Sequence, residues 1–143
     1  MIQRIQTLYL FLIVVFSALL FFFPFQINII GLSEIKYIQL HLLAAINTYI
    51  FIAFIINAII IVGTIATILL YQNRKRQMVL CHYLSIINVL LFLLMYIGAH
   101  PVKGMPIYKL PFIIPILNAA LAQIARWYIK KDEKLVKSAD RIR

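Results

Sequence analysis

Four apolar stretches, each near the length of a membrane-spanning helix, constrain the fold of this chain more than any other feature. A helix rises about 1.5 Å per residue, so about 20 apolar residues cross the hydrocarbon core of a bilayer. The stretches cover residues 5–25, 42–71, 78–99 and 111–129. The second is longer than the hydrocarbon core requires, so we expect it to tilt or to project. The pattern predicts an all-α integral membrane bundle of four transmembrane helices, with residues 1–143 in a single domain.

The composition excludes the soluble alternatives. Hydrophobic residues make up 64% of the 143 residues and charged residues 13%, so a globule of this size would lack the polar surface to cover its interior. The single cysteine, Cys81, excludes an internal disulfide, and we interpret it as a small hydrophobe. Residues 19–25 are bulky and aromatic and offer no small-residue cleavage site. We therefore expect the first stretch to be a retained helix and not a cleaved signal peptide.

The basic residues are concentrated on one side of the predicted membrane. The net charge is +10, and 11 of the 14 Lys and Arg residues lie at the N-terminus, in the connection 72–77 or from residue 126 onward. The other three are Lys36, Lys103 and Lys109, in the remaining two connections. The positive-inside rule then predicts that both termini are cytoplasmic. We interpret the charge as an orientation signal and as attraction to anionic lipid headgroups, and we expect no nucleic-acid partner.

Three asparagines fall near the centres of the second, third and fourth stretches, namely Asn57, Asn88 and Asn118. Such side chains form hydrogen bonds between helices in lipid, at about 0.6–2 kcal/mol per contact. We predict a polar midplane layer, which either sets the helix register or forms a pocket for a ligand headgroup or a partner helix. No Asp or Glu lies inside a predicted span, which argues against a proton- or cation-coupled carrier.

The C-terminal segment, residues 130–143, combines basic charge with an apolar stripe. Leu135, Ala139 and Ile142 recur at helical spacing, and nothing in the segment breaks a helix, so it can continue the fourth span. We predict a short cytoplasmic amphipathic helix that either lies on anionic headgroups or docks a partner. The candidate docking residues here and in the 72–77 connection are Arg74, Lys75, Arg76, Lys130, Lys131, Leu135, Ala139, Arg141 and Ile142.

The side chains that carry catalysis or bind metals form no recognisable pattern. His41 and His100 both fall near the outer face and are candidate haem or metal ligands, but no further ligand accompanies them. The chain has no Gly-rich phosphate loop, no paired carboxylates at a useful depth and no Cys/His metal spacing. We therefore expect no enzymatic activity, no metal and no resident cofactor.

The two ends of the chain and its central basic segment resemble one family of small membrane proteins. The resemblance is carried by MIQRIQT at 1–7, NRKRQ at 73–77 and KDEKLVKSADRIR at 131–143. These segments are similar to the bacterial domain-of-unknown-function family 4293, across essentially the whole chain. The resemblance implies a four-span protein in the inner membrane of Gram-negative bacteria. It supplies no catalytic or binding residues, because the family has no assigned activity.

These patterns favour a non-catalytic accessory or scaffold subunit of a larger bacterial inner-membrane complex. It would dock through its spans and its basic cytoplasmic face, and its partners would be anionic lipids and a membrane protein or a second copy of the chain. The alternative is a protein that binds a lipid, a quinone or another apolar ligand at the asparagine layer or near the outer histidines. A pore formed by oligomerisation is a weaker hypothesis, because no stretch carries a clear polar face.

Overall fold

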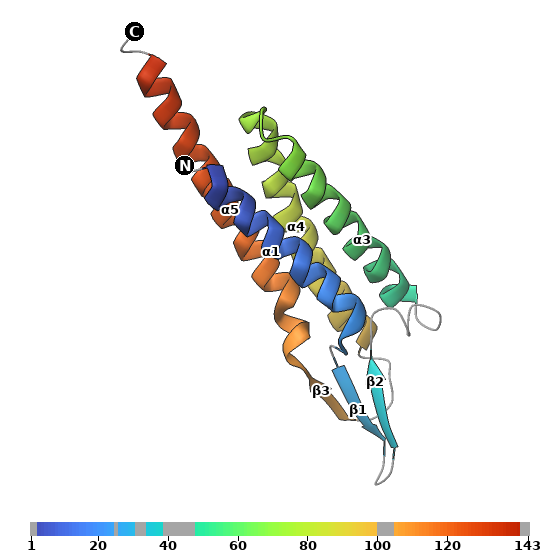
Figure 1. Cartoon of the computed structure of the whole chain (residues 1–143). Coiled ribbons are helices and arrows are strands. Elements are labelled where there is room, and N and C mark those ends of the chain that lie inside the picture. Colours follow the sequence, from blue (N-terminus) through green and yellow to red (C-terminus); the bar gives the residue numbers. More distant parts are fainter. Residues whose placement is uncertain (1–2, 25, 31–33, 39–47, 100–104, 141–143) are drawn as a thin grey trace.

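Four helices that alternate in direction form the bundle (Figure 1). The computed structural model describes residues 3–24, 26–30, 34–38, 48–99 and 105–140. The helices are α1 (Gln3–Phe22), α3 (Thr48–Leu69), α4 (Arg74–Ala99) and α5 (Ile114–Asp140). Helix α1 packs against α3 and α5, and α4 packs against the same two helices. All four are long and apolar enough to cross a membrane, which confirms the predicted four-span helical bundle.

The connection between α3 and α4 is shorter than the sequence pattern suggested. Helix α4 begins at Arg74, so the basic triplet Arg74–Arg76 forms its first turn and is not part of the connection. Asn73 explains this boundary, because its side-chain oxygen accepts a hydrogen bond from the backbone N–H of Arg76 at 3.4 Å, as a helix N-cap does. At the other end of α3, residues 42–47 of the predicted span lie outside the described residues.

The predicted C-terminal amphipathic helix is not a separate short element. Helix α5 runs without a break from Ile114 to Asp140, so the tail continues the fourth span. A 3₁₀ helix, η1 (Leu110–Ile113), leads into it. Pro115 falls in the first turn of α5, where a backbone N–H would have had no partner in the helix. The proline therefore does not require a bend in α5.

A three-stranded antiparallel sheet forms from two segments that the sequence analysis treated as connections. Its strands are β1 (Gln26–Ile30), β2 (Glu34–Ile38) and β3 (Met105–Tyr108), in the order β2-β1-β3. Ile27 of β1 is opposite Tyr37 on one side and Ile107 on the other. The strands are rich in isoleucine and tyrosine, which favour extended structure. The sheet therefore joins the connection after α1 to the one before α5 (Figure 1).

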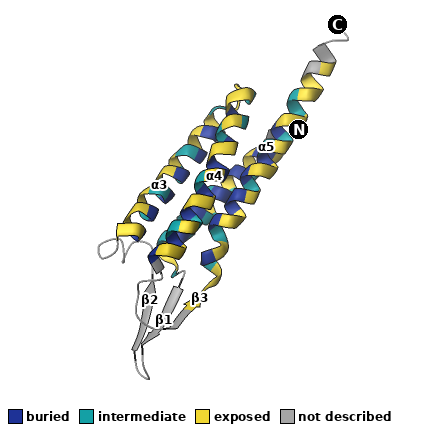
Figure 2. Cartoon of the chain, turned by 180° about the vertical axis from the view of Figure 1, so that it is seen from behind, coloured by how far each residue is buried: buried dark blue, intermediate teal, exposed yellow. Residues whose placement is uncertain are grey.

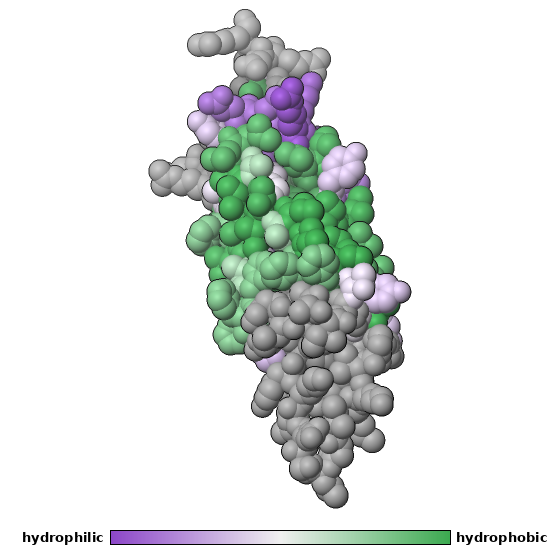
Figure 3. Space-filling view, turned by 90° about the vertical axis from the view of Figure 1, so that its right-hand side faces the viewer, coloured by the Kyte–Doolittle hydropathy of each residue, from purple (hydrophilic) through white to green (hydrophobic). Residues whose placement is uncertain are grey.

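Each helix buries one face and exposes the other (Figure 2). Many of the exposed residues are large and apolar. The largest fully buried side chains are Leu10, Ile13, Leu20, Ile50, Ile60, Leu91, Met95 and Ile129. Leu8, Val62 and Val79 are each more than half exposed. A broad apolar band covers the middle of the molecule and meets a hydrophilic cap (Figure 3). We call the capped end, where α3 meets α4, the basic end, and the opposite one the sheet end. The outward apolar surface suits a lipid environment.

Gly98 of α4 packs closely against the start of α3. A Cβ at this buried position would lie 2.8 Å from Ile50 Cγ1 and 3.2 Å from Tyr49 Cβ. At Gly63 a Cβ would meet only Leu84 Cδ2, at 3.3 Å. The end of a leucine side chain can move aside, whereas atoms next to a helix backbone cannot move without shifting the helix.

We predict that Gly98→Ala destabilises the bundle and that Gly63→Ala does not. Overpacking at Gly98 should cost about 1–3 kcal/mol, more than the gain of about 0.5–1 kcal/mol from a better helix-forming residue. The free energy of unfolding in detergent, measured by denaturant titration, separates the two variants. Equal stability of the Gly98→Ala variant and the unaltered protein would contradict the close packing described here.

Candidate functional site

Ser17 of α1 joins three helices in the middle of the bundle. The Asn57 Nδ2 group of α3 donates a hydrogen bond to the Ser17 backbone carbonyl at 3.0 Å. The Asn118 Nδ2 group of α5 donates to Ser17 Oγ, also at 3.0 Å. All three residues are fully buried. Two of the predicted midplane asparagines therefore converge on one serine, which the sequence analysis did not single out.

Asn88, the third asparagine of the predicted layer, is bonded differently. Its Nδ2 group donates to the Leu84 carbonyl of its own helix at 2.8 Å. The side-chain oxygens of Asn57, Asn88 and Asn118 are buried and have no hydrogen-bond partner among the described residues. The hydrogen bonds of Asn57 and Asn118 join helices and so favour a role in helix register. A ligand role for the layer stays a prediction.

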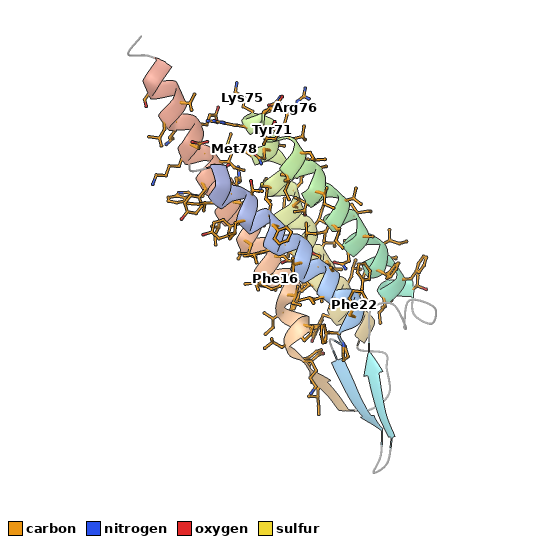
Figure 4. All side chains as sticks on the ribbon, in the orientation of Figure 1. Phe16, Phe22, Tyr71, Lys75, Arg76 and Met78 are labelled. Atoms are coloured by element: carbon orange, nitrogen blue, oxygen red, sulfur yellow. The ribbon has the colours of Figure 1, made fainter. Side chains whose placement is uncertain are left out.

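A second cluster of polar side chains lies at the basic end, beside a groove of about 530 Å³. Figure 4 shows Tyr71, Lys75 and Arg76 gathered where α3 gives way to α4. The groove lies between α1, the end of α3 and the start of α4. Its lining residues are Gln6, Thr7, Leu8, Phe11, Ile68, Tyr71, Arg74 and Gln77. We call it the basic-end groove.

Two glutamines of the basic-end groove are buried but bonded unequally. Gln77 is 4% exposed, and its Nε2 group donates to the Thr67 carbonyl of α3 at 3.2 Å. Gln6 is 5% exposed, and its Nε2 group has no hydrogen-bond partner among the described residues. A buried amide donor without a partner costs about 1–3 kcal/mol, so Gln6 is a group that a ligand oxygen would satisfy.

Arg74 fixes the last part of α5 to the start of α4. Its Nη1 atom lies 3.2 Å from Asp132 Oδ2 and donates to the Asp132 backbone carbonyl at 3.4 Å. The two side chains are 26% and 13% exposed, so the pair is partly shielded from solvent. The Lys131 Nζ atom lies 5.5 Å from the centre of the Trp127 ring. The Arg74 contacts therefore hold α5 to α4 at this end, whereas the Lys131–Trp127 contact lies within α5.

The structure places the predicted docking residues in different surroundings. Arg74 is bound to Asp132, whereas Lys75, Arg76, Lys130, Lys131 and Leu135 are exposed. Ala139 lies within α5. Arg141 and Ile142 lie outside the described residues, as do the candidate ligands His41 and His100. Within the described part of the chain, no three His, Cys, Asp or Glu side chains are grouped as metal ligands would be.

One polar contact between α4 and α5 was not predicted from the sequence. The His82 Nδ1 atom lies 3.3 Å from Arg126 Nη1 and 3.4 Å from Gln123 Nε2. Both neighbours are donors, so Nδ1 accepts in this arrangement. The sequence feature that could have indicated this contact is the spacing of Gln123 and Arg126, which are three residues apart and so share one helix face.

The comparison with known families identifies one match. The model of the family described as Domain of unknown function (DUF4293) matches residues 2–142, nearly the whole chain. No curated protein and no solved structure matches the chain. The match confirms the resemblance carried by the two ends and the central basic segment, while a location in a bacterial inner membrane stays a prediction.

We predict that Ser17 and Asn118 are energetically coupled. Ser17→Ala removes the Oγ acceptor, and Asn118→Leu removes the donor, so each single variant should lose the same bond. A double-mutant cycle on the free energy of unfolding in detergent should give a coupling of about 0.6–2 kcal/mol. Additive effects would show that this hydrogen bond does not hold α5 to α1.

Asn88→Leu provides the matched control. The Asn88 amide donates only to its own helix, so its replacement removes no bond between helices. We expect a change in unfolding free energy within about 0.5 kcal/mol, because leucine suits the apolar surroundings. A loss as large as that of Asn118→Leu would contradict the distinction drawn between these asparagines.

Proposed function

We propose that this chain, which belongs to the DUF4293 family, is a non-catalytic accessory or scaffold subunit of a larger bacterial inner-membrane complex. The basic end would face the cytoplasm and dock a partner. The observation that carries the proposal is the course of α5, which runs past the other helices at this end (Figure 1). We call its last residues, 133–140, the α5 extension.

The direction of the α5 extension favours docking over adsorption to the membrane surface. A helix that adsorbs to headgroups lies in the plane of the interface. The α5 extension instead continues a spanning helix without a break, and the Arg74–Asp132 ion pair lies at its base. It therefore leaves the bundle along the direction of the span, as a helix that meets a protein partner would.

The surface of the α5 extension has the composition of a helix-docking face. Leu135 is 49% exposed and Val136 is 43% exposed, although both are large and apolar. Lys134 is exposed beside them. An apolar stripe flanked by charge binds a groove or a second helix, because the apolar pair supplies the affinity and the charges select the partner.

The distribution of charge in the folded chain supports the proposed orientation. Arg74–Arg76, Lys130, Lys131 and Lys134 lie at the basic end, whereas Lys109 lies at the sheet end, directly before η1. The excess of Lys and Arg at one end is the pattern that the positive-inside rule associates with the cytoplasmic side. A tagged form with a reporter at each end would establish the topology directly.

We predict that Leu135→Glu releases a partner that is otherwise recovered in fixed proportion. The chain, purified gently from its native membranes, should carry one partner protein at constant stoichiometry. A charge in the apolar stripe should reduce its recovery at least tenfold, since a buried unpaired charge at an interface costs about 2–5 kcal/mol. Quantitative mass spectrometry of the purified material measures the ratio.

Lys109→Gln is the matched control. It lowers the net charge by one, as Leu135→Glu does, but it changes an exposed residue at the sheet end, away from the α5 extension. We expect the partner ratio to change less than twofold. Recovery of the unaltered chain alone, without any stoichiometric partner, would refute the proposed role.

A further inference from the structure

The basic-end groove changes from polar to apolar along α1. Gln6 lies near the basic end, where α1 begins, and Phe11 lies five residues further toward the middle of the bundle. At about 1.5 Å per residue, this places the ring about 7–8 Å deeper along the helix axis. Leu8 and Phe11 are 57% and 59% exposed. The groove thus offers a polar site with an apolar wall below it, the profile of one lipid molecule.

The polar end of the groove carries a basic side chain. Arg74 lines it, and Lys75 and Arg76 follow in the same helical turn but line a separate groove. This turn is also the N-terminus of α4, where backbone N–H groups carry partial positive charge. Asp132 neutralises part of the charge of Arg74, while Lys75 and Arg76 remain exposed. The local excess of positive charge favours an anionic ligand over a neutral one.

The buried Gln6 amide is independent of this charge and also points to a ligand. Gln6 lines the groove, and its buried Nε2 atom has no hydrogen-bond partner among the described residues. A phosphodiester oxygen is an acceptor that would satisfy it. A general electrostatic attraction to headgroups would need no such donor, so Gln6 distinguishes a built site from simple adsorption.

We propose that the basic-end groove binds one anionic phospholipid. The phosphate lies against Arg74 and the Gln6 amide at the start of α4, and an acyl chain lies along Leu8 and Phe11. The inference does not depend on the accessory role, since it rests on α1, α3 and α4 and not on the α5 extension. It locates lipid recognition away from the asparagine layer.

Native mass spectrometry of the purified chain tests the proposal. The protein in detergent is titrated with phosphatidylglycerol or with phosphatidylcholine of the same acyl chains. We expect one phosphatidylglycerol to bind at least tenfold more tightly than phosphatidylcholine. Gln6→Leu should weaken phosphatidylglycerol binding about tenfold, because it removes a donor to a charged oxygen without changing any charge.

Leu8→Trp tests the apolar wall. The fold should tolerate this substitution, since Leu8 faces outward. The larger ring should fill the groove and reduce phosphatidylglycerol binding at least tenfold. Val62→Trp is its matched control, because Val62 is 67% exposed and lies outside the groove. We expect the control to bind as the unaltered chain does.

Asp132→Asn removes the ion-pair partner of Arg74 and keeps the charge of Arg74 itself. If Arg74 binds the lipid phosphate, removal of the competing carboxylate should leave phosphatidylglycerol binding unchanged or strengthen it.

Equal binding of the two lipids, or unchanged binding after both Gln6→Leu and Leu8→Trp, would overturn the proposal. Competition by an equimolar neutral quinone would also overturn it and would assign the groove to a neutral ligand. None of these outcomes bears on partner recovery, which tests the accessory role separately.

Discussion

The constraint on which this structure depends is that apolar side chains cover both the inner and the outer faces of its helices. In lipid, an outward leucine and an inward leucine are in similar surroundings, so hydrophobicity cannot decide which faces meet. Close packing and a few hydrogen bonds decide it instead. Gly98 lets α4 approach α3, and Ser17 receives one bond from α3 and one from α5. The arrangement of the bundle follows from these local contacts.

At the basic end, Arg74 has the role that Gly98 and Ser17 have elsewhere, because it joins different elements of the bundle. It is the first residue of α4, it pairs with Asp132 of α5, and it lines the groove beside α1. One side chain thus contacts the element proposed to dock a partner and the groove proposed to hold a lipid. A lipid phosphate and Asp132 would draw on the same guanidinium group.

The candidate site was predictable in part, and the reason differs from residue to residue. The burial of Asn57, Asn88 and Asn118 follows from their depth in apolar stretches, which the sequence displays directly. Their partners do not follow, because a serine such as Ser17 becomes an acceptor only when other helices face it. Gln6 was likewise missed, since its burial depends on which other helices pack against α1.

The sequence by itself determined the number of long apolar helices and the concentration of basic charge at the end where α3 meets α4, because hydropathy and charge are local properties of consecutive residues. The tertiary structure alone decided the pairing of β1 with β3, the contact of Asp132 with Arg74, and the groove beside α1. Each of these joins segments that are distant in the chain. Their energies arise only after the helices have packed, so no pattern within a single segment records them.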